Sequence, residues 1–525
     1  MPQIVWCSLA LTSELIIKII DNYSGKMVSR KRFLPRVLRR VGNRGIDSSF
    51  LFVIAFFFIF CTVISLEIFL VDKKSIQPDI QDSGTMFRKR VISEEKKGFF
   101  GSFLSNEQDG IEMDLEFPDI GDCLETGLCP WQPVKGMRAK FYVFSAYVDL
   151  RKKSTIKIIG ATKTKYPEKP ICLFGFQKNS TFDTQWKAVQ SNVKVIRENW
   201  NLKYSAVFIY CPMSNEIPDF VSISSNGSLP FSRSFSSTES IDPKTLVNGN
   251  ILPILNRNPP ATTSELLGVC VKPFHFEWNQ AINLLEFLEL HKLLGVTHFT
   301  FYNNSVGHEV DCILREYMKK GEVTMLPWKL NIISQKQIRT EGLFASLNDC
   351  VYRNMFKSEY LLLIDLDEFI LPHMNNTYME MLDFLHTKSK KEKIGAYSFQ
   401  NGFFYQQFPR DTSVNLPIDL LTQIKTQRRK KLHPHKQRSK YICKPNFIQE
   451  AGNHFIWEFE AGKGTVQVPP DVGYLHHYRV CEFGGDDCVK EESMIDRTAH
   501  KYQSELLKSV LAAIDDIGSV CKLKL

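Results

Sequence analysis

Two aspartates that directly follow a run of aliphatic residues are the strongest chemical signal in this sequence. Residues 361–369 read LLLIDLDEF, so Asp365 and Asp367 stand two positions apart after four apolar residues. In an extended chain, residues two apart point to the same face, and two such carboxylates repel each other unless a cation lies between them. Hard divalent cations prefer oxygen ligands and commonly bridge a substrate phosphate. The pattern predicts a metal site at a strand end; the alternative is a polar turn after a buried strand.

A second polar cluster lies near the C-terminus, where residues 473–479 read GYLHHYR. Either His476 or His477 could complete a metal shell, and Arg479 could bind a phosphate or carboxylate through two hydrogen bonds. The alternative is a surface strand with an incidental pair of histidines.

A basic stretch is the third candidate, because residues 425–440 hold eight Lys or Arg in 16 positions. It could be a mobile lid over a pyrophosphate, or a solvated charged loop. Lys440 and Lys444, in the segment KYICKP, are better candidates for contact with a phosphate. Other catalytic motifs are missing from the sequence: it has no G-x-S-x-G, no H-E-x-x-H, no P-loop and no C-x-x-C.

The segments around these residues alternate between strand and helix patterns from about residue 265. Residues 278–295 and 340–357 have helical spacing, and residues 359–372 read as a strand that runs into acidic residues. Alternating strands and helices predict an α/β fold with a mostly parallel sheet, whose ligands bind beyond the carboxyl ends of the strands. Residues 136–260, by contrast, look rich in β-strands and have few helical periods.

A hydrophobic segment near the N-terminus is predicted to span a membrane. Residues 48–66 are 19 consecutive uncharged residues, enough to cross a hydrocarbon core of about 30 Å. A buried helix and a cleaved signal peptide are the alternatives. Eight Lys or Arg at positions 26–44 precede the segment, so the positive-inside rule places the N-terminus in the cytosol. The rest of the chain is then lumenal or extracellular.

The net charge of +9 is concentrated before this segment. Residues 1–47 hold nine Lys or Arg and three acidic residues, so most of the excess is a short tail. A basic nucleic-acid-binding body is therefore not expected.

The cysteines and glycosylation sequons agree with an oxidising lumen. Eleven of the 13 cysteines follow the hydrophobic segment, so at most five disulfides form and one thiol stays free. Cys123 and Cys129 could close a small loop. Sequons of the type N-x-S/T, the acceptors for N-glycans, also follow this segment. They begin at Asn179, Asn226, Asn303 and Asn375.

The stretch from residue 270 to 479 resembles glycosyltransferase family 92, and the segment FSAYVDLR at 144–151 also looks like this family. Within the family, the sequence is most similar to animal β-1,4-galactosyltransferases that act on the core fucose of N-glycans. The matching segments are CVKPF at 270–274, EFLELHKLLGVTHFTFYNNS at 286–305, NDC at 348–350, LLLIDLDEFILP at 361–372, SKYICKPNFIQEAGNH at 439–454 and HHYR at 476–479.

The resemblance implies a GT-A type nucleotide-sugar transferase domain and a UDP-galactose donor. A divalent cation, usually Mn²⁺, would be held by Asp365 and Asp367 and would act as a Lewis acid for the leaving UDP. His477 matches the family's H-Y-R and is a candidate third ligand. Asn303 would lie by the nucleotide, which argues against its glycosylation. Asp349 would contact the ribose or the donor sugar.

An inverting reaction needs a carboxylate base on the acceptor hydroxyl, opposite the UDP. We favour Glu458, in the segment FIWEFE, as this base. The aromatic residues Phe455, Trp457 and Phe459 could stack on a sugar face or could be ordinary core residues. The acidic residues available after the metal motif are Asp419, Glu450, Glu458, Glu460 and Asp471.

The expected protein is a single-pass type II membrane protein of the Golgi whose partners are a sugar nucleotide, a glycan acceptor and the membrane. The alternatives are another UDP-sugar or acceptor on the same fold, an inactive lectin-like glycan-binding protein, and a lumenal metal-dependent phosphohydrolase. The expected organisation is a cytosolic tail at 1–47, a transmembrane signal-anchor at 48–71, a stem at 72–135, a β-rich region at 136–262, a catalytic domain at 263–500 and a C-terminal helix or tail at 501–525.

Overall fold

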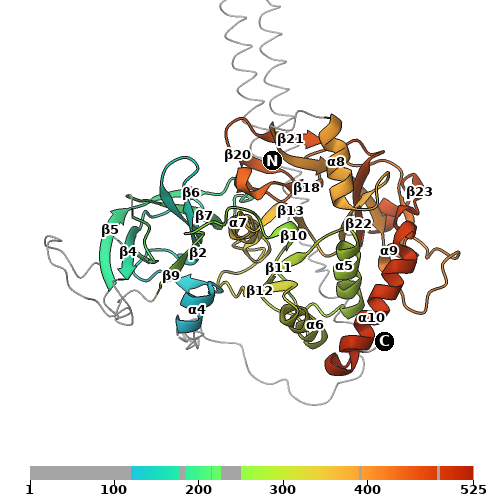
Figure 1. Cartoon of the computed structure of the whole chain (residues 1–525), viewed down its shortest axis with the longest axis horizontal. Coiled ribbons are helices and arrows are strands. Elements are labelled where there is room, and N and C mark those ends of the chain that lie inside the picture. Colours follow the sequence, from blue (N-terminus) through green and yellow to red (C-terminus); the bar gives the residue numbers. More distant parts are fainter. Residues whose placement is uncertain are drawn as a thin grey trace, which may run out of the picture. The chain divides into compact units, whose positions relative to one another are not determined.

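Figure 1 shows the computed structural model, in which the described residues are 120–177, 184–214, 216–225, 250–388, 393–481 and 485–523. All of them belong to one unit of the chain, Met113–Leu525. The predicted tail, the signal-anchor and most of the stem lie outside the described residues, as do Asn179 and Asn226. Among the residues that are described, no helix is long and apolar enough to cross a membrane.

The N-terminal part of the described chain is a nine-stranded sheet that follows the short helix α4, Ile120–Thr126. The strand order is β5-β4-β8-β9-β2-β3-β7-β6, with β1 paired to β2. All pairs are antiparallel except β2 with β9. The strands are rich in β-branched and aromatic residues, which pack well on a pleated surface. They are β1 Gln132–Pro133, β2 Tyr142–Asp149, β3 Thr155–Lys163, β4 Ile171–Gln177, β5 Thr184–Gln190, β6 Asn192–Val195, β7 Tyr204–Pro212, β8 Phe220–Ser224 and β9 Leu252–Leu255.

The second large sheet has seven strands in the order β12-β11-β10-β13-β18-β15-β21. Four of its six pairings are parallel, but β18 runs antiparallel to both of its neighbours. The sheet is therefore mixed, and the prediction of a mostly parallel sheet holds best for its first four strands. The strands are β10 Glu265–Val271, β11 His298–Asn303, β12 Val323–Pro327, β13 Ser358–Ile364, β15 Ile394–Phe399, β18 Lys440–Cys443 and β21 Gly464–Gln467.

A three-stranded sheet lies beside the acidic motif, in the order β14-β22-β16. The predicted strand at 359–372 is in fact two strands, because the chain turns after β13 and continues as β14, Glu368–Pro372. β14 pairs with β22, Gly473–Arg479, which in turn pairs with β16, Asn401–Tyr405. Two further pairs complete the strands of this part: β17 Gln427–Arg429 with β23 Ser493–Ile495, and β19 Ile448–Ala451 with β20 Ile456–Phe459.

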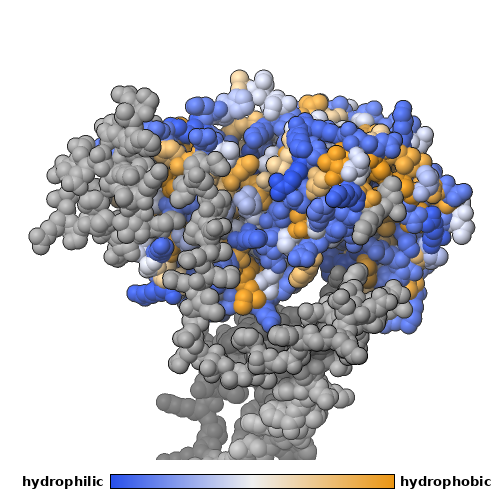
Figure 2. All heavy atoms as spheres, turned by 90° about the horizontal axis from the view of Figure 1, so that it is seen from below, coloured by the Kyte–Doolittle hydropathy of each residue, from blue (hydrophilic) through white to orange (hydrophobic). Residues whose placement is uncertain are grey.

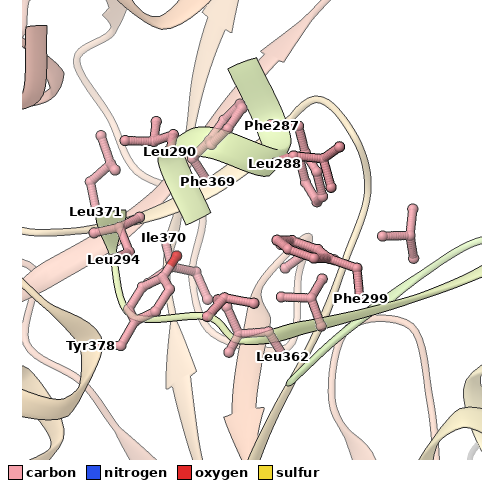
Figure 3. Close-up of a cluster of buried hydrophobic side chains, with 14 of the residues drawn as sticks. Phe287, Leu288, Leu290, Leu294, Phe299, Leu362, Phe369, Ile370, Leu371 and Tyr378 are labelled. Carbon is pink, nitrogen blue, oxygen red and sulfur yellow. The ribbon is translucent and has the colours of Figure 1, made fainter. Parts of the chain in front are cut away.

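The helices cover the two faces of the seven-stranded sheet differently. Residues of α5, α6 and α10 belong to the hydrophobic core on one face, where Phe287 of α5 packs beside Phe299 of β11 and Phe369 of β14 (Figure 3). The other face packs against α7, which also contacts β3 and β7 of the N-terminal sheet. The helices are α5 Ala281–Leu293, α6 His308–Lys319, α7 Leu343–Arg353, α8 Tyr378–Lys388, α9 Leu421–Ile424 and α10 Gln503–Cys521.

The described cysteines form five disulfides, the predicted maximum, and leave the predicted free thiol. The free thiol is Cys443, which is buried. The predicted small loop between Cys123 and Cys129 is also confirmed. The other four bonds are Cys172–Cys211, Cys270–Cys350, Cys312–Cys521 and Cys481–Cys488.

Candidate active site

The carboxyl ends of three neighbouring parallel strands bring polar side chains to one edge of the seven-stranded sheet. Lys272 directly follows β10, Asn303 ends β11, and Asp365 directly follows β13. β10 lies between the other two strands and is parallel to both. Ligand-binding residues are expected at this edge from the sequence, and Asn303 and Asp365 lie there.

Asp365 is held between two lysines. One carboxylate oxygen lies 3.1 Å from Lys272 Nζ, and the other lies 3.3 Å from Lys440 Nζ. Burial by itself would raise the pKa of the Asp365 carboxyl, but the charges of Lys272, Lys440 and His477 outweigh burial and hold that pKa below its ordinary value. Asp365 is thus an ionised carboxylate already paired with two lysines, so of the two predicted carboxylate ligands Asp367 is the more open to a metal ion.

No motif in the sequence marks Lys272 as a site residue. The segment CVKPF contributed to the family resemblance, but nothing in it predicted that this lysine would meet Asp365. The available signal was its position: it follows a buried strand that pairs in parallel with the strand before the acidic motif. Its Nζ would add positive charge where a diphosphate is expected.

Asp367 faces His477 across the small sheet. His477 Nε2 lies 3.3 Å from an Asp367 oxygen, while His477 Nδ1 lies 3.3 Å from Glu368. Glu368 and His477 are directly opposite each other in the β14–β22 pairing. A carboxylate that holds one imidazole nitrogen and leaves the other directed to a ligand is the usual support of a metal-binding histidine.

Strand alternation decides between the two histidines of HHYR. His476 points the other way from His477, is fully buried, and stacks against Phe404 with ring centroids 4.4 Å apart. Burial lowers the pKa of His476 well below its ordinary value. His477 is therefore the one that faces the carboxylates.

The residues at this edge fit a divalent cation held jointly by protein and substrate. Within the described ranges, no group of three or more His, Cys, Asp or Glu side chains is arranged to hold a metal ion. Asp367 and His477 are a pair, and the side chain of Asp367 is 37% exposed and open to a ligand. Cations that work with nucleotide substrates commonly take one or two protein ligands and complete their shell with phosphate oxygens and water. A two-ligand protein site suits that arrangement.

The comparison with protein families agrees with this geometry, because residues 266–512 match the model of glycosyltransferase family 92. The match covers 247 of the 525 residues, a little under half of the chain. The matched residues include both sheets that form the acidic edge, together with α5, α6, α7 and the first half of α10. The family resemblance inferred from the sequence is thus confirmed for this part of the chain.

Three Caenorhabditis elegans proteins are similar to parts of the chain. Glycosyltransferase family 92 protein F13G3.3 is 26% identical over 142 residues, which are 25% of this chain and 28% of that protein. Beta-1,4-galactosyltransferase galt-1 is 22% identical over 253 residues, 47% of this chain and 55% of that protein. Glycosyltransferase family 92 protein C33H5.2 is 26% identical over 132 residues, 23% of this chain and 26% of that protein. The chain therefore spans between about a quarter and about half the length of these curated relatives.

Among solved structures, Staphylococcus aureus TarS 1–349 is similar with 12% sequence identity and a TM-score of 0.23. The match covers 50% of this chain and 76% of that chain. The same protein in complex with UDP-GlcNAc matches at 11% identity with the same TM-score. A TM-score this low carries no argument about the present chain.

Asp349 does not lie at a binding surface. Its side chain is 0% exposed and accepts hydrogen bonds from the hydroxyls of Ser145, Tyr147 and Tyr302, the last two at 2.6 and 2.7 Å. Arg353 Nε completes the set at 3.1 Å. These contacts occupy the carboxylate and leave no place for a ribose or donor sugar, so we do not keep that predicted role.

Lys440 and Lys444 lie at opposite ends of β18. Because β18 runs antiparallel to β13, Lys440 reaches the acidic edge, while Lys444 follows the other end of the strand. Lys444 Nζ lies 5.0 Å from the centroid of the Tyr360 ring and 3.9 Å from Glu359. Only Lys440 therefore remains a candidate for contact with a phosphate next to Asp365.

Arg479 ends β22 on the same face as His477, since the two are two residues apart in the strand. Both side chains pack on Phe403: the Arg479 guanidinium lies 5.5 Å from the ring centroid, and the ring of His477 lies 5.3 Å from it. This position is compatible with the predicted contact to a diphosphate.

Glu458, the predicted base, is ion-paired with three basic side chains of the N-terminal region. Its oxygens lie 3.1 Å from Lys152 Nζ, 2.9 Å from Lys194 Nζ and 2.8 Å from Arg197. Burial would raise the pKa of Glu458, but these hydrogen bonds and charges lower it to about 2. A carboxylate that is so weakly basic and so fully paired fits a structural role better than proton transfer.

The basic stretch at 425–440 is ordered by ion pairs and is not a free lid. Arg428 Nε lies 2.9 Å from Asp496, and Lys430 Nζ lies 2.6 Å from Glu492. Arg429 pairs with Glu491.

Asn375, the described sequon outside the acidic edge, is partly buried, and its carbonyl accepts a hydrogen bond from Lys501 Nζ. Its glycosylation stays a prediction.

Proposed function

We propose that the family 92 domain transfers galactose from UDP-galactose to a glycan acceptor with the help of a divalent cation such as Mn²⁺. The observation that carries this proposal is the Asp367–His477 pair, oriented by Glu368 and flanked by Lys272 and Lys440. One such pair can share a cation with a diphosphate, and the lysines add positive charge beside it. The name of the relative Beta-1,4-galactosyltransferase galt-1 supports galactose as the sugar.

The residues of this edge divide the work as follows. Asp367 and His477 would hold the cation, which when bound supplies Lewis-acid assistance to departure of the UDP. Glu368 fixes the His477 ring, since it contacts Nδ1 and also accepts a hydrogen bond from the Asp365 backbone N–H at 2.8 Å. Lys272 and Arg479 would neutralise diphosphate oxygens, and Lys440 would add its charge from a buried position beside Asp365 and Glu368.

The proposed chemistry is a single displacement with inversion. The acceptor hydroxyl oxygen forms a bond to C1 of galactose while the bond from C1 to the UDP oxygen breaks, and a carboxylate of this chain takes the hydroxyl proton. An α-linked donor would give a β-galactoside. The contacts of Glu458 favour a search for this base among other residues.

The acceptor and the location are the narrower parts of the proposal. The acceptor is the core fucose of N-glycans, and the protein is a type II membrane protein of the Golgi with this domain in the lumen. The hydrophobic segment at 48–66 and its basic flank support the topology. Five disulfides among the described residues are typical of an oxidising compartment.

The test is an assay of the purified full-length protein with a panel of UDP-sugars. The acceptors are matched N-glycans with and without core fucose, in Mn²⁺ and in EDTA. We expect transfer from UDP-galactose to the fucosylated glycan alone, only with the cation, and a β linkage by NMR. Transfer from another UDP-sugar would show that the donor is not UDP-galactose. Full activity in EDTA would overturn the metal site. Glycan binding without any transfer would favour a lectin-like protein.

A further inference from the structure

A cavity of about 320 Å³ lies at the end of the seven-stranded sheet formed by β18, β15 and β21. The strands β10, β11 and β12 lie toward the opposite end. Its floor is formed by β15, β18 and β21, which contribute Ser398, Tyr441 and Gln467. The register places Ser398 opposite both Tyr441 and Gln467, so the three side chains share one face of the sheet. Sites for small ligands have volumes from about 300 Å³ upward, so this cavity is large enough for a small ligand.

The walls of the cavity are aromatic. Phe455 and Phe459 come from the segment that the sequence analysis considered for sugar stacking. The Phe459 ring lies directly on Gly395 of β15, where an added Cβ would come within 2.6 Å of it. Trp457 is excluded from the cavity, because it packs on Gly452 instead. Phe455 and Phe459 therefore face the cavity, whereas Trp457 is an ordinary packing residue.

The polar groups of the cavity suit a neutral ligand rich in hydroxyls. Ser398 Oγ lies 3.0 Å from His435 Nδ1, and Gln467 adds an exposed amide. The residues that line the cavity include no carboxylate, and the one permanent cation among them is Lys436, whose Nζ lies 5.9 Å from the Phe455 ring centroid. Apolar walls with a few polar groups are the usual composition of a small-molecule site.

A short series of residue contacts links the cavity to the acidic edge. Lys440 Nζ, which contacts Asp365, also donates a hydrogen bond to Asn453 Oδ1 at 3.0 Å. Asn453 stands two residues before Phe455, and the intervening His454 is joined to Ser439 by two hydrogen bonds. The segment from Asn453 to Phe455 thus runs from Lys440, at the acidic edge, to the cavity wall.

We propose that this cavity binds a pyranose ring of the acceptor glycan, a ring next to the one that receives galactose. The proposal rests on the proposed function. The faces of a pyranose ring pack on aromatic walls, and its hydroxyls find partners in Ser398, His435 and Gln467. The donor fits elsewhere, because its diphosphate requires the cations of Lys272 and Lys440, which do not line the cavity.

The test uses the full-length protein and two cavity variants, Gln467→Trp and Phe455→Ala. Gln467→Trp fills the space from an exposed strand position, and Phe455→Ala removes one wall. Gln185→Trp is the matched control, an exposed glutamine of β5 in the N-terminal sheet. The readouts are KM for the acceptor glycan, Kd for UDP in Mn²⁺, and direct binding of the N-glycan in the absence of donor.

We expect both cavity variants to raise the acceptor KM about tenfold or more, the effect of losing one well-packed aromatic contact, with Kd for UDP unchanged. The control should match the wild type. A weaker Kd for UDP with an unchanged acceptor KM would assign the cavity to the donor and overturn the proposal. Normal values throughout would also overturn it, while transfer by the wild type would leave the proposed function standing.

Failure of the proposed function gives a different pattern. The wild type would then transfer no sugar from any UDP-sugar, and the glycan-binding readout would decide about the cavity by itself. Binding by the wild type and the control, but not by Gln467→Trp, would keep the cavity as a glycan site. Equal binding by all of these proteins, or none, would reject it.

Discussion

At the scale of single residues, the two aspartates of the acidic motif have different environments although they are two positions apart. Asp365 is 16% exposed and lies between Lys272 and Lys440, whereas Asp367 is 37% exposed and faces His477. Burial would raise the pKa of Asp367, but His477 outweighs it and lowers that pKa below its ordinary value. Asp367 is thus an ionised carboxylate that a ligand can reach.

We therefore expect Asp367→Asn to lower kcat/KM by at least about two orders of magnitude, since it removes an anionic ligand that stabilises transition-state charge. Asp365→Asn should lower kcat/KM to a similar extent, because Lys272 and Lys440 would lose the carboxylate that holds them in place. The measurement is steady-state kinetics over a range of Mn²⁺ concentrations, together with thermal unfolding. Asp383→Asn, an exposed carboxylate on α8, is the control. Full activity in both site variants would contradict the metal site.

Asp349 allows a test of stability at the same scale. Asp349→Asn should lower the free energy of unfolding by about 3–5 kcal/mol, because it leaves the buried Arg353 guanidinium without its counter-charge. Denaturant unfolding measures this change. A variant with normal stability and a weakened affinity for UDP would instead restore the ligand-binding role that the sequence suggested.

At the scale of elements, β20 joins the region that matches the family model to the N-terminal sheet through Glu458. Its partner Lys194 is in β6, and Lys194 also lies 2.6 Å from the buried Glu450 of β19. The ion pairs thus link β6 to the β19–β20 hairpin. This arrangement explains why an acidic residue near the family motifs is not free for catalysis.

Glu458→Gln should therefore change acid stability more than turnover. The folded-state pKa of Glu458 is about 2, below its ordinary value of 4.5. A lowered carboxyl pKa stabilises the fold above pH about 4.5, and this contribution is lost as the pH falls from there toward 2. The variant should show a flatter stability profile over that window and near-normal kcat at neutral pH. A loss of kcat of a hundredfold with unchanged stability would identify Glu458 as the base.

At the scale of the whole molecule, the two sheets share a hydrophobic core. Trp131 and Phe144 of the N-terminal region pack on Trp328, with ring centroids 5.0 and 4.5 Å away. The same cluster includes residues of α7 and β13. On the face shown in Figure 2, hydrophobic residues of the described part are interspersed with hydrophilic ones.

We expect a chain that begins at residue 263 not to fold by itself, because it would expose Trp328 and the apolar face of α7. A chain that begins at residue 113 should fold and form all five disulfides. Proteolysis and cooperative thermal unfolding distinguish the two outcomes. Cooperative unfolding of the shorter chain, with activity, would show that the N-terminal sheet is a separate module.

The membrane topology belongs to the same scale and lies outside the described residues. Replacement of residues 1–71 by a cleavable secretory signal peptide should give a secreted, glycosylated and active protein, because the hydrophobic segment is expected to act only in targeting and anchoring. Treatment with a glycosidase should increase the mobility of the full-length protein on a gel. Absence of a shift, with a C-terminal tag open to protease from the cytosolic side, would reverse the predicted orientation.

Local patterns in the sequence were sufficient for several conclusions. Four apolar residues before Asp365 predicted the strand end, because burial on both faces requires such a run. The odd number of cysteines after the hydrophobic segment required a free thiol, and the order of the motifs pointed to the family. The α/β alternation was also local, since helix and strand periods differ within a few residues.

The tertiary structure alone decided which residues meet. The pairing of β14 with β22 selected His477 over His476, and the antiparallel direction of β18 brought Lys440, not Lys444, to Asp365. The shared core buried Asp349. The physical reason is that register, strand direction and burial depend on partners distant in the chain. A local pattern limits the face on which a side chain lies, but it does not say what packs against that face.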